Sequence, residues 1–308
     1  MTDQEPRSGR AYAVVTPTRN NADTLAETVR SVTAQSSLPV RWVIVSDGST
    51  DGTDEIVRAA AERHPFIRLI RRSTGESGGF GSKVAAFEVG RAALADVDYE
   101  FIGNLDADVA FGPDYFERLL DAFAGDHRLG VAGGSIVEHL GDRTIPQRVS
   151  ANSVAGAVQL FRRQCFDDTG GFVPLPLGGE DSTVEIMARA SGWYVRTLFD
   201  LPVIHHGRIG VRNGSSIQAR FCKGMTNYIL GYDPAFHAAI SAYRMRDRPY
   251  VVGGISMLAG YAWAALRRPP RALPDSGIRF LRAEQRRRLL GTLALRSPVR
   301  VGAFTSRT

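Results

Sequence analysis

The chain has 308 residues, of which 44% are hydrophobic and 23% charged, the balance of a soluble globular protein rather than a disordered or fibrous one. Its formal net charge is +6, and its two cysteines, Cys165 and Cys222, lack the C-x-x-C spacing of a zinc site. Residues 1–10 contain two acids and no apolar core, so we expect a disordered N-terminus, no secretory signal, and free thiols in a cytosolic protein.

The first predicted elements are a strand over residues 11–16 and a helix after it. Thr24 and Glu27 have the S/T-x-x-E spacing of a capping box, which predicts that the helix begins near Thr24. Apolar residues at helical spacing predict its inner face, which consists of Leu25, Val29 and Val32.

The alternation of strands and helices continues to residue 105. Strands are predicted over residues 41–45, 66–71 and 100–105, and helices over residues 54–62 and 83–95. Strands that alternate with helices through mostly short loops predict an α/β fold with a parallel, doubly wound sheet.

After residue 112 the pattern is less regular. Short strands are predicted over residues 130–136, 157–161, 194–198 and 202–205. Residues 251–266 form a mostly apolar run, shorter than the roughly 20 residues that a membrane-spanning helix needs. We therefore expect a buried or interfacial helix there, with a membrane span as the less favoured alternative.

Basic residues gather at the C-terminal end. Residues 267–308 contain eleven Arg against Asp275 and Glu284, a balance of +9, so the rest of the chain carries −3. Together with the apolar run, this tail predicts attachment to an anionic membrane surface, where each nearby basic residue contributes roughly 1 kcal/mol. On a helical wheel Gln285 falls among the apolar residues of the tail, with Arg282 at their edge, so the predicted tail helix is not cleanly amphipathic.

Acidic residues follow the predicted strands in three clusters. Asp47 follows the second strand, Asp106 and Asp108 follow the fourth, and Glu180 and Asp181 come later, after two glycines. Residues just past the strands of an α/β sheet lie at its carboxyl edge, where such folds bind ligands. Carboxylates at this edge can hold a nucleotide, bridge a metal ion to its phosphates and deprotonate an acceptor.

The loop after the first strand excludes two common nucleotide-binding folds. A dinucleotide fold needs G-x-G-x-x-G directly after that strand, but Thr16-Pro17-Thr18-Arg19-Asn20 contains no glycine. The chain also contains no G-x-x-x-x-G-K-[ST] sequence of a P-loop.

Four segments in order resemble the motifs of the inverting family 2 glycosyltransferases, which have the GT-A fold. They are Pro17-Thr18-Arg19-Asn20, Asp47-Gly48-Ser49-Thr50-Asp51-Gly52-Thr53, Leu105-Asp106-Ala107-Asp108 and Gly179-Glu180-Asp181. The resemblance covers about residues 11–206. It implies a GT-A catalytic domain over residues 11–245, with a nucleotide-binding half over 11–112 and an acceptor half over 113–245. Residues 246–308 would form an apolar, Arg-rich helical extension that associates with a membrane.

The resemblance implies a donor site at the first motifs. Asp47 would accept hydrogen bonds from the imide edge of the base, and Pro17, Thr18, Arg19 and Asn20 would flank the base. Many relatives have an aromatic residue where Arg19 stands, and a guanidinium plane can stack similarly, so the identity of the base stays open.

The resemblance also implies a Gly-rich loop that covers the sugar nucleotide. Residues 73–83 are rich in glycine and precede a predicted helix. Backbone N–H groups and a helix N-terminus suit a diphosphate, and this makes Gly79 and Lys83 candidate donor-binding residues. A turn without contact to the ligand is the alternative for each of them.

Asp106 and Asp108 are the implied metal-binding pair. Asp106 would reach the ribose or the metal, and Asp108 would ligate Mg²⁺ or Mn²⁺, which favours oxygen ligands. The ion would neutralise charge on the leaving nucleoside diphosphate. Relatives often have a His at the position of His205 and His206, and strand alternation lets only one of them face the site. We favour His205 as the third ligand.

The catalytic base is implied at the last motif. An inverting transfer is a single displacement, so one carboxylate must take the proton of the acceptor hydroxyl. The resemblance puts this base at Asp181, with Glu180 as the alternative, and we expect a structural role for Glu185. Residues 218–221 match the Q-x-x-R-W signature of processive synthases only in part, which favours a non-processive enzyme.

The sequence therefore predicts a metal-dependent inverting glycosyltransferase of polysaccharide biosynthesis. It would move a sugar from a nucleoside-diphosphate sugar to a glycan or lipid-linked glycan at the cytoplasmic face of the membrane. One alternative is a nucleotidyltransferase that forms the sugar nucleotide, although the first loop offers only Arg19 of the basic signature it needs. A nucleic-acid-binding protein is disfavoured, because only Phe280 and Phe304 can stack on bases among the tail arginines.

Overall fold

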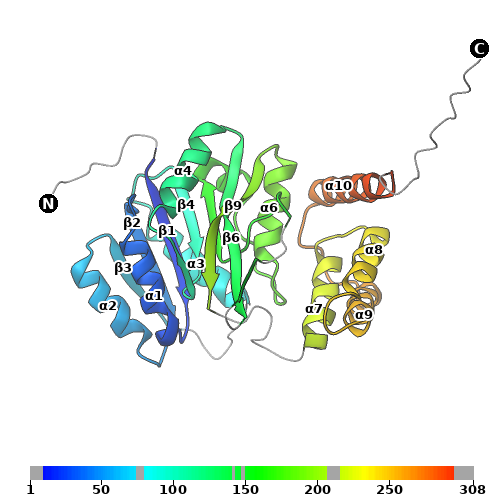
Figure 1. Cartoon of the computed structure of the whole chain (residues 1–308), viewed down its shortest axis with the longest axis horizontal. Helices are drawn as coiled ribbons and strands as arrows, with labels where there is room; N and C mark the ends of the chain where they lie inside the picture. Colours follow the sequence, from blue (N-terminus) through cyan, green and yellow to red (C-terminus); the bar gives the residue numbers. More distant parts are fainter. Residues whose placement is uncertain (1–9, 74–79, 141–142, 147–149, 207–215, 295–308) are drawn as a thin grey trace, which may run out of the picture. The chain divides into compact units, whose positions relative to one another are not determined.

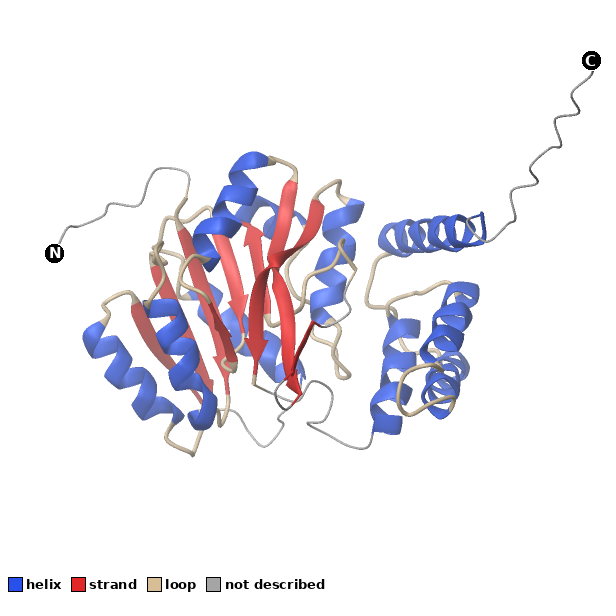
Figure 2. Cartoon of the chain, viewed as in Figure 1, coloured by secondary structure: helices blue, strands red, loops and turns tan. Residues whose placement is uncertain are grey.

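A computed structural model describes residues 10–73, 80–140, 143–146, 150–206 and 216–294 (Figures 1 and 2). Contacts divide these residues into two compact units, which we call the sheet unit, ending at residue 206, and the helical unit, beginning at residue 216. The predicted domain boundary after residue 245 falls inside the helical unit. As a boundary of function it stays a prediction.

One sheet forms the centre of the sheet unit. Its described strands are β1 Tyr12–Thr18, β2 Arg41–Asp47, β3 Ile67–Arg72, β4 Phe101–Leu105, β5 Val109–Phe111, β6 Leu129–Leu140, β7 Arg143–Pro146, β8 Val158–Arg162 and β9 Tyr194–His205. They lie in the order β3-β2-β1-β4-β8-β6-β9-β5, with β7 paired to β6. The first four are parallel, whereas β8 runs antiparallel to β4 and β5 antiparallel to β9. The predicted α/β class is confirmed.

Helices cover both faces of this sheet (Figure 2). The helices of the sheet unit are α1 Ala22–Thr33, α2 Thr53–Arg63, α3 Phe80–Ala92, α4 Tyr115–Gly125, α5 Arg163–Asp168 and α6 Glu180–Ala190. Tyr12 and Val14 of β1 belong to the core shared with α1, α2 and α4, and Ala13 and Val15 to the core shared with α3, α5 and α6. Because successive side chains alternate between two buried faces, residues 12–15 of β1 and 42–45 of β2 are all apolar and buried.

The predicted capping box is wrong. The N-cap of α1 is Asn21, and Thr24 lies inside the helix. The N–H groups at the start of α1 are satisfied from the next loop, since Thr53 Oγ1 accepts from Asn21 N at 2.9 Å and Asp51 Oδ2 accepts from Ala22 N at 3.0 Å. Side chains distant in sequence thus replace the local cap.

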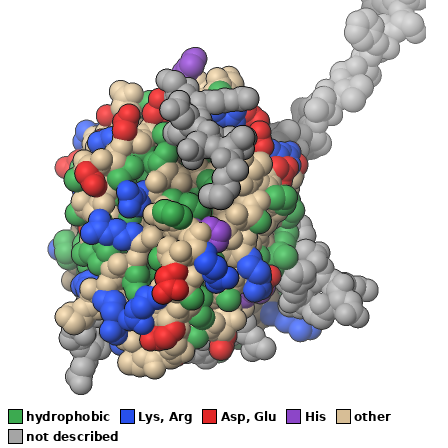
Figure 3. All heavy atoms as spheres, turned by 90° about the vertical axis from the view of Figure 1, so that its left-hand side faces the viewer, with side chains coloured by type: hydrophobic (Ala, Val, Ile, Leu, Met, Phe, Trp, Pro, Cys, Tyr) green, Lys and Arg blue, Asp and Glu red, His purple; other side chains and the backbone are tan. Residues whose placement is uncertain are grey.

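Charged side chains of both signs are interspersed on the side of the molecule that carries α2 (Figure 3). Arg58 Nη1 lies 3.0 Å from Glu55 Oε1, and Arg71 Nε lies 2.5 Å from Asp54 Oδ2. The Arg58–Glu55 pair is exposed, and such pairs contribute at most about 1 kcal/mol, whereas the carboxylate of Asp54 is buried beneath Arg71. We interpret the outer part of this surface as a solvated one.

The helical unit contains α7 Ser216–Ile229, α8 Pro234–Arg244, α9 Val252–Arg267 and α10 Asp275–Ala294. Two glycines let α7 and α9 approach closely. A Cβ on Gly224 would lie 2.1 Å from Met257 O, and one on Gly260 would lie 2.0 Å from Phe221 O. This packing explains why α7, which the sequence assigned to the catalytic domain, forms one compact unit with α9. Gly254 brings α9 close to α8 in the same way, since a Cβ there would lie 2.5 Å from Ser241 O.

Helix α10 packs on the N-terminus of α8. Gln285, only 3% exposed, accepts a hydrogen bond from Asp233 N at 2.8 Å through its Oε1. Arg286 Nε donates to Asp233 Oδ2 at 2.8 Å, and Arg282 Nε donates to Gly231 O at 2.9 Å. The polar residues that interrupt the apolar face of the tail helix therefore have defined partners.

The apolar run at residues 251–266 is helical, as expected, and forms most of α9. Among the residues that the structure describes, no helix has both the length and the hydrophobicity that crossing a bilayer requires.

Candidate active site

The sheet topology brings the candidate metal ligands together. Asp106 directly follows β4, and Asp108 directly precedes β5. Because β5 pairs with β9 in the register Val109 to His205, the end of β9 lies beside Asp108. Asp106, Asp108 and His205 each offer a ligand atom, and these atoms all lie within 4.8 Å of one another.

His205 and its neighbour point to different sides, as strand alternation predicts. His205 Nε2 lies 3.5 Å from Asp108 Oδ1, whereas His206 Nε2 lies 3.1 Å from Glu27 Oε2 of α1. The side chains of His205 and Asp108 are only 12% and 15% exposed. Two carboxylates and an imidazole in this geometry fit a divalent cation such as Mg²⁺ or Mn²⁺.

Lys83, near the start of α3, lies between Asp106 and the acidic pair Glu180 and Asp181. Its Nζ lies 2.6 Å from Asp106 Oδ1. Burial lowers the pKa of Lys83, but the charges of Asp106, Glu180 and Asp181 outweigh this and raise it, so the ammonium stays protonated. The same side chain lines a small hollow of about 10 Å³ together with Asn104, Glu180 and Asp181.

The two base candidates stand at the N-terminus of α6, and their surroundings differ. Gly179 precedes them with φ +108°, a left-handed conformation that favours glycine. Glu180 is 8% exposed, and burial, followed by the charge of Asp181, raises its pKa. Asp181 is more exposed, and its Oδ1 accepts from Ser182 N at 2.7 Å. Asp181 is therefore the more accessible of the two carboxylates.

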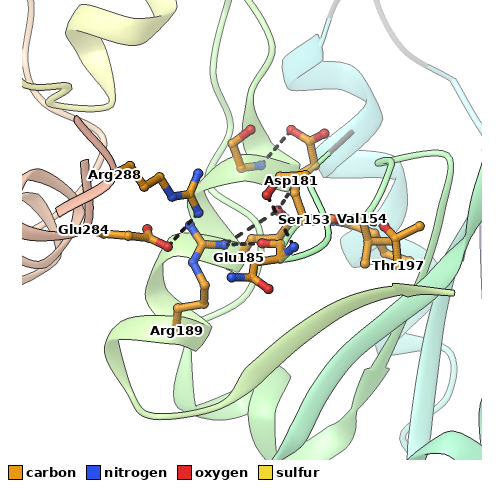
Figure 4. Close-up of polar contacts among 12 residues, drawn as sticks. Ser153, Val154, Asp181, Glu185, Arg189, Thr197, Glu284 and Arg288 are labelled. Atoms are coloured by element: carbon orange, nitrogen blue, oxygen red, sulfur yellow. Dashed lines mark hydrogen bonds and ion pairs between the residues drawn. The ribbon is translucent and has the colours of Figure 1, made fainter. Parts of the chain in front are cut away.

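Glu185 holds α6 against the segment before β8 (Figure 4). Its Oε1 accepts from Val154 N at 2.7 Å and from Gln159 Nε2 at 3.0 Å, and its Oε2 accepts from Ser153 Oγ at 2.8 Å. Burial raises the pKa of Glu185 to about 7, and the charge of Asp181 adds to this effect. These contacts match the structural role expected for Glu185.

Residues 153–157, which we call the bridge segment, link Asp181 to the end of β4, beside Asp106. Asn104 Nδ2 donates to Gly156 O at 2.6 Å, and Asp106 N donates to Ala157 O at 2.9 Å. A Cβ on Gly156 would lie 2.7 Å from Asp181 Oδ2. Sequence reasoning predicted a strand from residue 157 but missed residues 153–156, because they have neither a periodic apolar pattern nor a motif.

The predicted nucleoside end of the site lies at the ends of β1 and β2. Asp47, the last residue of β2, is 5% exposed; its carboxylate lies 3.5 Å from Arg72 Nη1 and accepts a hydrogen bond from Ser82 Oγ. Sequence reasoning did not identify these two partners. Thr18, the last residue of β1, is buried, and β1 and β2 pair in the register Thr18 to Ser46.

The other predicted donor-binding residues have varied environments. Pro17 is half-buried within β1, and Arg19 and Asn20 are exposed in the loop that follows. Asn20 has φ +51°, and its Oδ1 accepts from Thr50 N at 2.9 Å, so this side chain shapes the loop. Gly79 lies outside the described residues.

The fold is that of a GT-A glycosyltransferase. A mannosyltransferase from Pyrobaculum calidifontis, solved in complex with GDP-Man and Mn²⁺, matches 94% of this chain and 81% of its own length with a TM-score of 0.54. Since the sequences are 18% identical, this likeness shows the fold alone. The sequence model of Glycosyl transferase family 2 matches residues 13–174, more than half of the chain, and the chain belongs to this family.

Two relatives illustrate the range of the family. An uncharacterized glycosyltransferase of Nostoc sp. is 28% identical over 166 residues, which are 52% of this chain and 49% of the relative. The N-acetylglucosaminyl-diphospho-decaprenol L-rhamnosyltransferase of Mycobacterium tuberculosis is 31% identical over 141 residues, 43% of this chain and 41% of the relative. The matched regions thus span half or less of these relatives. Family membership favours the glycosyltransferase prediction over the nucleotidyltransferase and nucleic-acid-binding alternatives.

Proposed function

We propose that the chain is a metal-dependent, inverting and non-processive glycosyltransferase. It transfers a sugar from a nucleoside-diphosphate sugar to a hydroxyl group of a glycan or lipid-linked glycan. The observation that carries the proposal is the grouping of Asp106, Asp108 and His205 within 4.8 Å, connected through Lys83 to the hollow that Asp181 lines. The Mn²⁺ and GDP-Man of the Pyrobaculum structure support it by analogy of fold.

Asp106, Asp108 and His205 would hold Mg²⁺ or Mn²⁺ between them. Such an ion supplies positive charge against the negative charge that develops on the leaving nucleoside diphosphate. Lys83 adds a second cationic group next to Asp106. Its raised pKa keeps it protonated at neutral pH, so it can also pair with a phosphate oxygen.

Asp47 would recognise the base. Its carboxylate is oriented by Arg72 and Ser82, so its position at the end of β2 is defined. An imide N–H donates well to such an acceptor. The exposed Arg19 lies after the buried Thr18 and would stack on the base from the neighbouring loop.

Asp181 would take the proton from the acceptor hydroxyl as that oxygen attacks the anomeric carbon. Asp181 is preferred over Glu180 because it is more accessible, whereas burial favours a neutral Glu180. The bridge segment and Glu185 would hold the base at a set distance from the metal ligands.

The protein would attach peripherally to the cytoplasmic face of a membrane and bind its acceptor there. The net charge of +6 and the basic C-terminal region support this location. The name of the Mycobacterium tuberculosis relative, which specifies a decaprenol-linked acceptor, supports a lipid-linked substrate.

A thermal-shift panel with UDP, GDP and dTDP, each with and without Mn²⁺, tests the donor site. A ligand that binds the native state raises the free energy of unfolding, by about 2.7 kcal/mol at a ligand concentration of 100 times Kd. The melting temperature rises as a result. We expect at least one nucleotide to stabilise the protein only when Mn²⁺ is present. Stabilisation of equal size without the ion would contradict metal dependence, and no response to any nucleotide would contradict the donor site.

A further inference from the structure

Helix α9 buries mainly small side chains, together with Met257, and exposes several of its large apolar ones. The buried residues are Gly253, Gly254, Ser256, Met257, Gly260 and Ala264. The large apolar side chains of Val252, Ile255, Trp263 and Leu266 are between 44% and 79% exposed. We call these four residues the outer stripe. A helix that serves only to stabilise its own unit normally has the opposite arrangement.

The outer stripe runs along the whole helix. Its positions recur at intervals of three, eight and three residues on one side of α9, which is about 24 Å long at 1.5 Å per residue. The sequence has no charged residue from Val252 to Leu266. Fully burying one such large side chain contributes about 1.5–3 kcal/mol, so an apolar environment would favour this face strongly.

Arginine and aromatic side chains flank the stripe at both ends. The distances from guanidinium carbon to ring centre are 5.7 Å for Arg246 and Tyr243, 5.9 Å for Arg248 and Tyr250, and 4.6 Å for Arg267 and Trp263. All six side chains are exposed. Tyrosine and tryptophan prefer the boundary between lipid and water, and arginine can bury its stem there while its charge stays among the headgroups.

The net positive charge of the helical unit favours a negatively charged partner. Residues 216–291 contain thirteen Lys and Arg and four Asp and Glu, a net charge of +9. A second copy of such a unit would be repelled, whereas an anionic lipid surface would be attracted. Two tail arginines, Arg282 and Arg286, bond within the unit, so the tail helix has a structural role besides its charge.

We propose that the outer stripe of α9 lies in the headgroup region of an anionic phospholipid membrane, with the helix parallel to the surface. The inference rests on the proposed peripheral attachment and deepens it, because it assigns the membrane contact of the apolar run to four exposed side chains on one face of α9. Apolar side chains enter the acyl boundary, and the flanking arginines bind lipid phosphates.

Vesicle flotation of the full chain tests this assignment, with Trp263 as an internal reporter. The probes are vesicles of phosphatidylcholine with about a third phosphatidylglycerol, and vesicles of phosphatidylcholine alone. The test variant is Ile255→Gln/Leu266→Gln, which changes two exposed positions and keeps Trp263. The matched control is Leu290→Gln, because Leu290 is a 67% exposed apolar residue of α10 outside the stripe.

We expect the wild type and the control to float with anionic vesicles and the double variant to bind at least about tenfold more weakly, since tenfold corresponds to 1.4 kcal/mol. In a Trp193→Phe background the remaining tryptophans are the fully buried Trp42 and the exposed Trp263, so a blue shift of the emission on addition of vesicles would report on Trp263. Binding of the double variant to anionic vesicles as tight as that of the wild type would overturn the proposal. A blue shift of the fluorescence that depends on protein concentration without vesicles would also overturn it, because Trp263 would then be covered by a second copy of the chain. The nucleotide-dependent melting shift, measured in parallel, reports separately on the donor site.

Discussion

Substituting alanine for Gly156 should displace the proposed catalytic base without unfolding the protein. The added Cβ would lie 2.7 Å from Asp181 Oδ2 and 3.1 Å from Asp181 Cγ. Ordinary van der Waals contact begins at 3.4 Å, so the carboxylate must retreat by about 0.7 Å. The neighbouring atoms belong to a partly exposed side chain, so we expect stability to change by less than about 1 kcal/mol.

A base that is misplaced by about 1 Å can lower turnover by 10²-fold, so we expect Gly156→Ala to reduce kcat by about 10- to 100-fold. The affinity for the nucleoside diphosphate should stay within about twofold, because the substitution does not touch the donor-binding residues. The assay is steady-state release of nucleoside diphosphate with donor and acceptor varied separately, together with a thermal melt of each variant.

Gly125→Ala is the matched control. A Cβ at Gly125, the last residue of α4, would meet no atom within 4 Å among the described residues. Wild-type kcat in Gly156→Ala would refute the reasoning, since the carboxylate would then tolerate displacement. A combined Gly156→Ala/Asp181→Asn variant should be no slower than Asp181→Asn alone, because both changes remove the same function.

Asp108→Ala should abolish the Mn²⁺ dependence of nucleotide binding with the fold intact; unchanged dependence in a titration would show that Asp108 is not a ligand. Asp181→Asn should keep donor binding but lower turnover by about 10²–10⁴, whereas near-normal turnover with a collapse in Glu180→Gln would assign the base to Glu180. Burial raises the pKa of Glu185 to about 7, so the folded protein holds a proton that the unfolded chain releases above its ordinary pKa of 4.5. Stability should therefore fall by about 3 kcal/mol as pH rises from 4.5 to 7, and Glu185→Gln should remove this slope in urea melts. Deleting residues 275–308 should lower the melting temperature, because Asp233 loses its partners in α10; an unchanged melt would contradict that role.

The parts of the fold that follow a strict period were predictable from sequence. Short apolar runs identified β1, β2 and β4, and the motif residues Asp106, Asp108 and His205 do come together in space. Their roles toward ligands stay predictions. The pairing of β5 with β9, which creates this grouping, joins residues far apart in sequence, and no local pattern encodes it.

Other features depend on tertiary contacts that local sequence does not contain. Residues 194–198 and 202–205, predicted as two strands, form the single strand β9, because an irregularity in its pairing with β6 absorbs the intervening residues. The predicted helix over residues 83–95 begins earlier, at Phe80. The outward face of α9 was also not predictable, since an apolar run does not tell which of its sides is buried.

The capping of α1 by Asp51 and Thr53 has a thermodynamic consequence. The backbone of Asn21 and Ala22 is tied to these side chains, and the backbone of Thr50 is tied in turn to Asn20. The two loops beside the proposed base site therefore form one ordered element before any ligand arrives. Ordering a free residue would cost roughly 1–2 kcal/mol of conformational entropy. Binding of a nucleoside here should thus lose little entropy to loop ordering, which leaves more of the contact enthalpy for affinity.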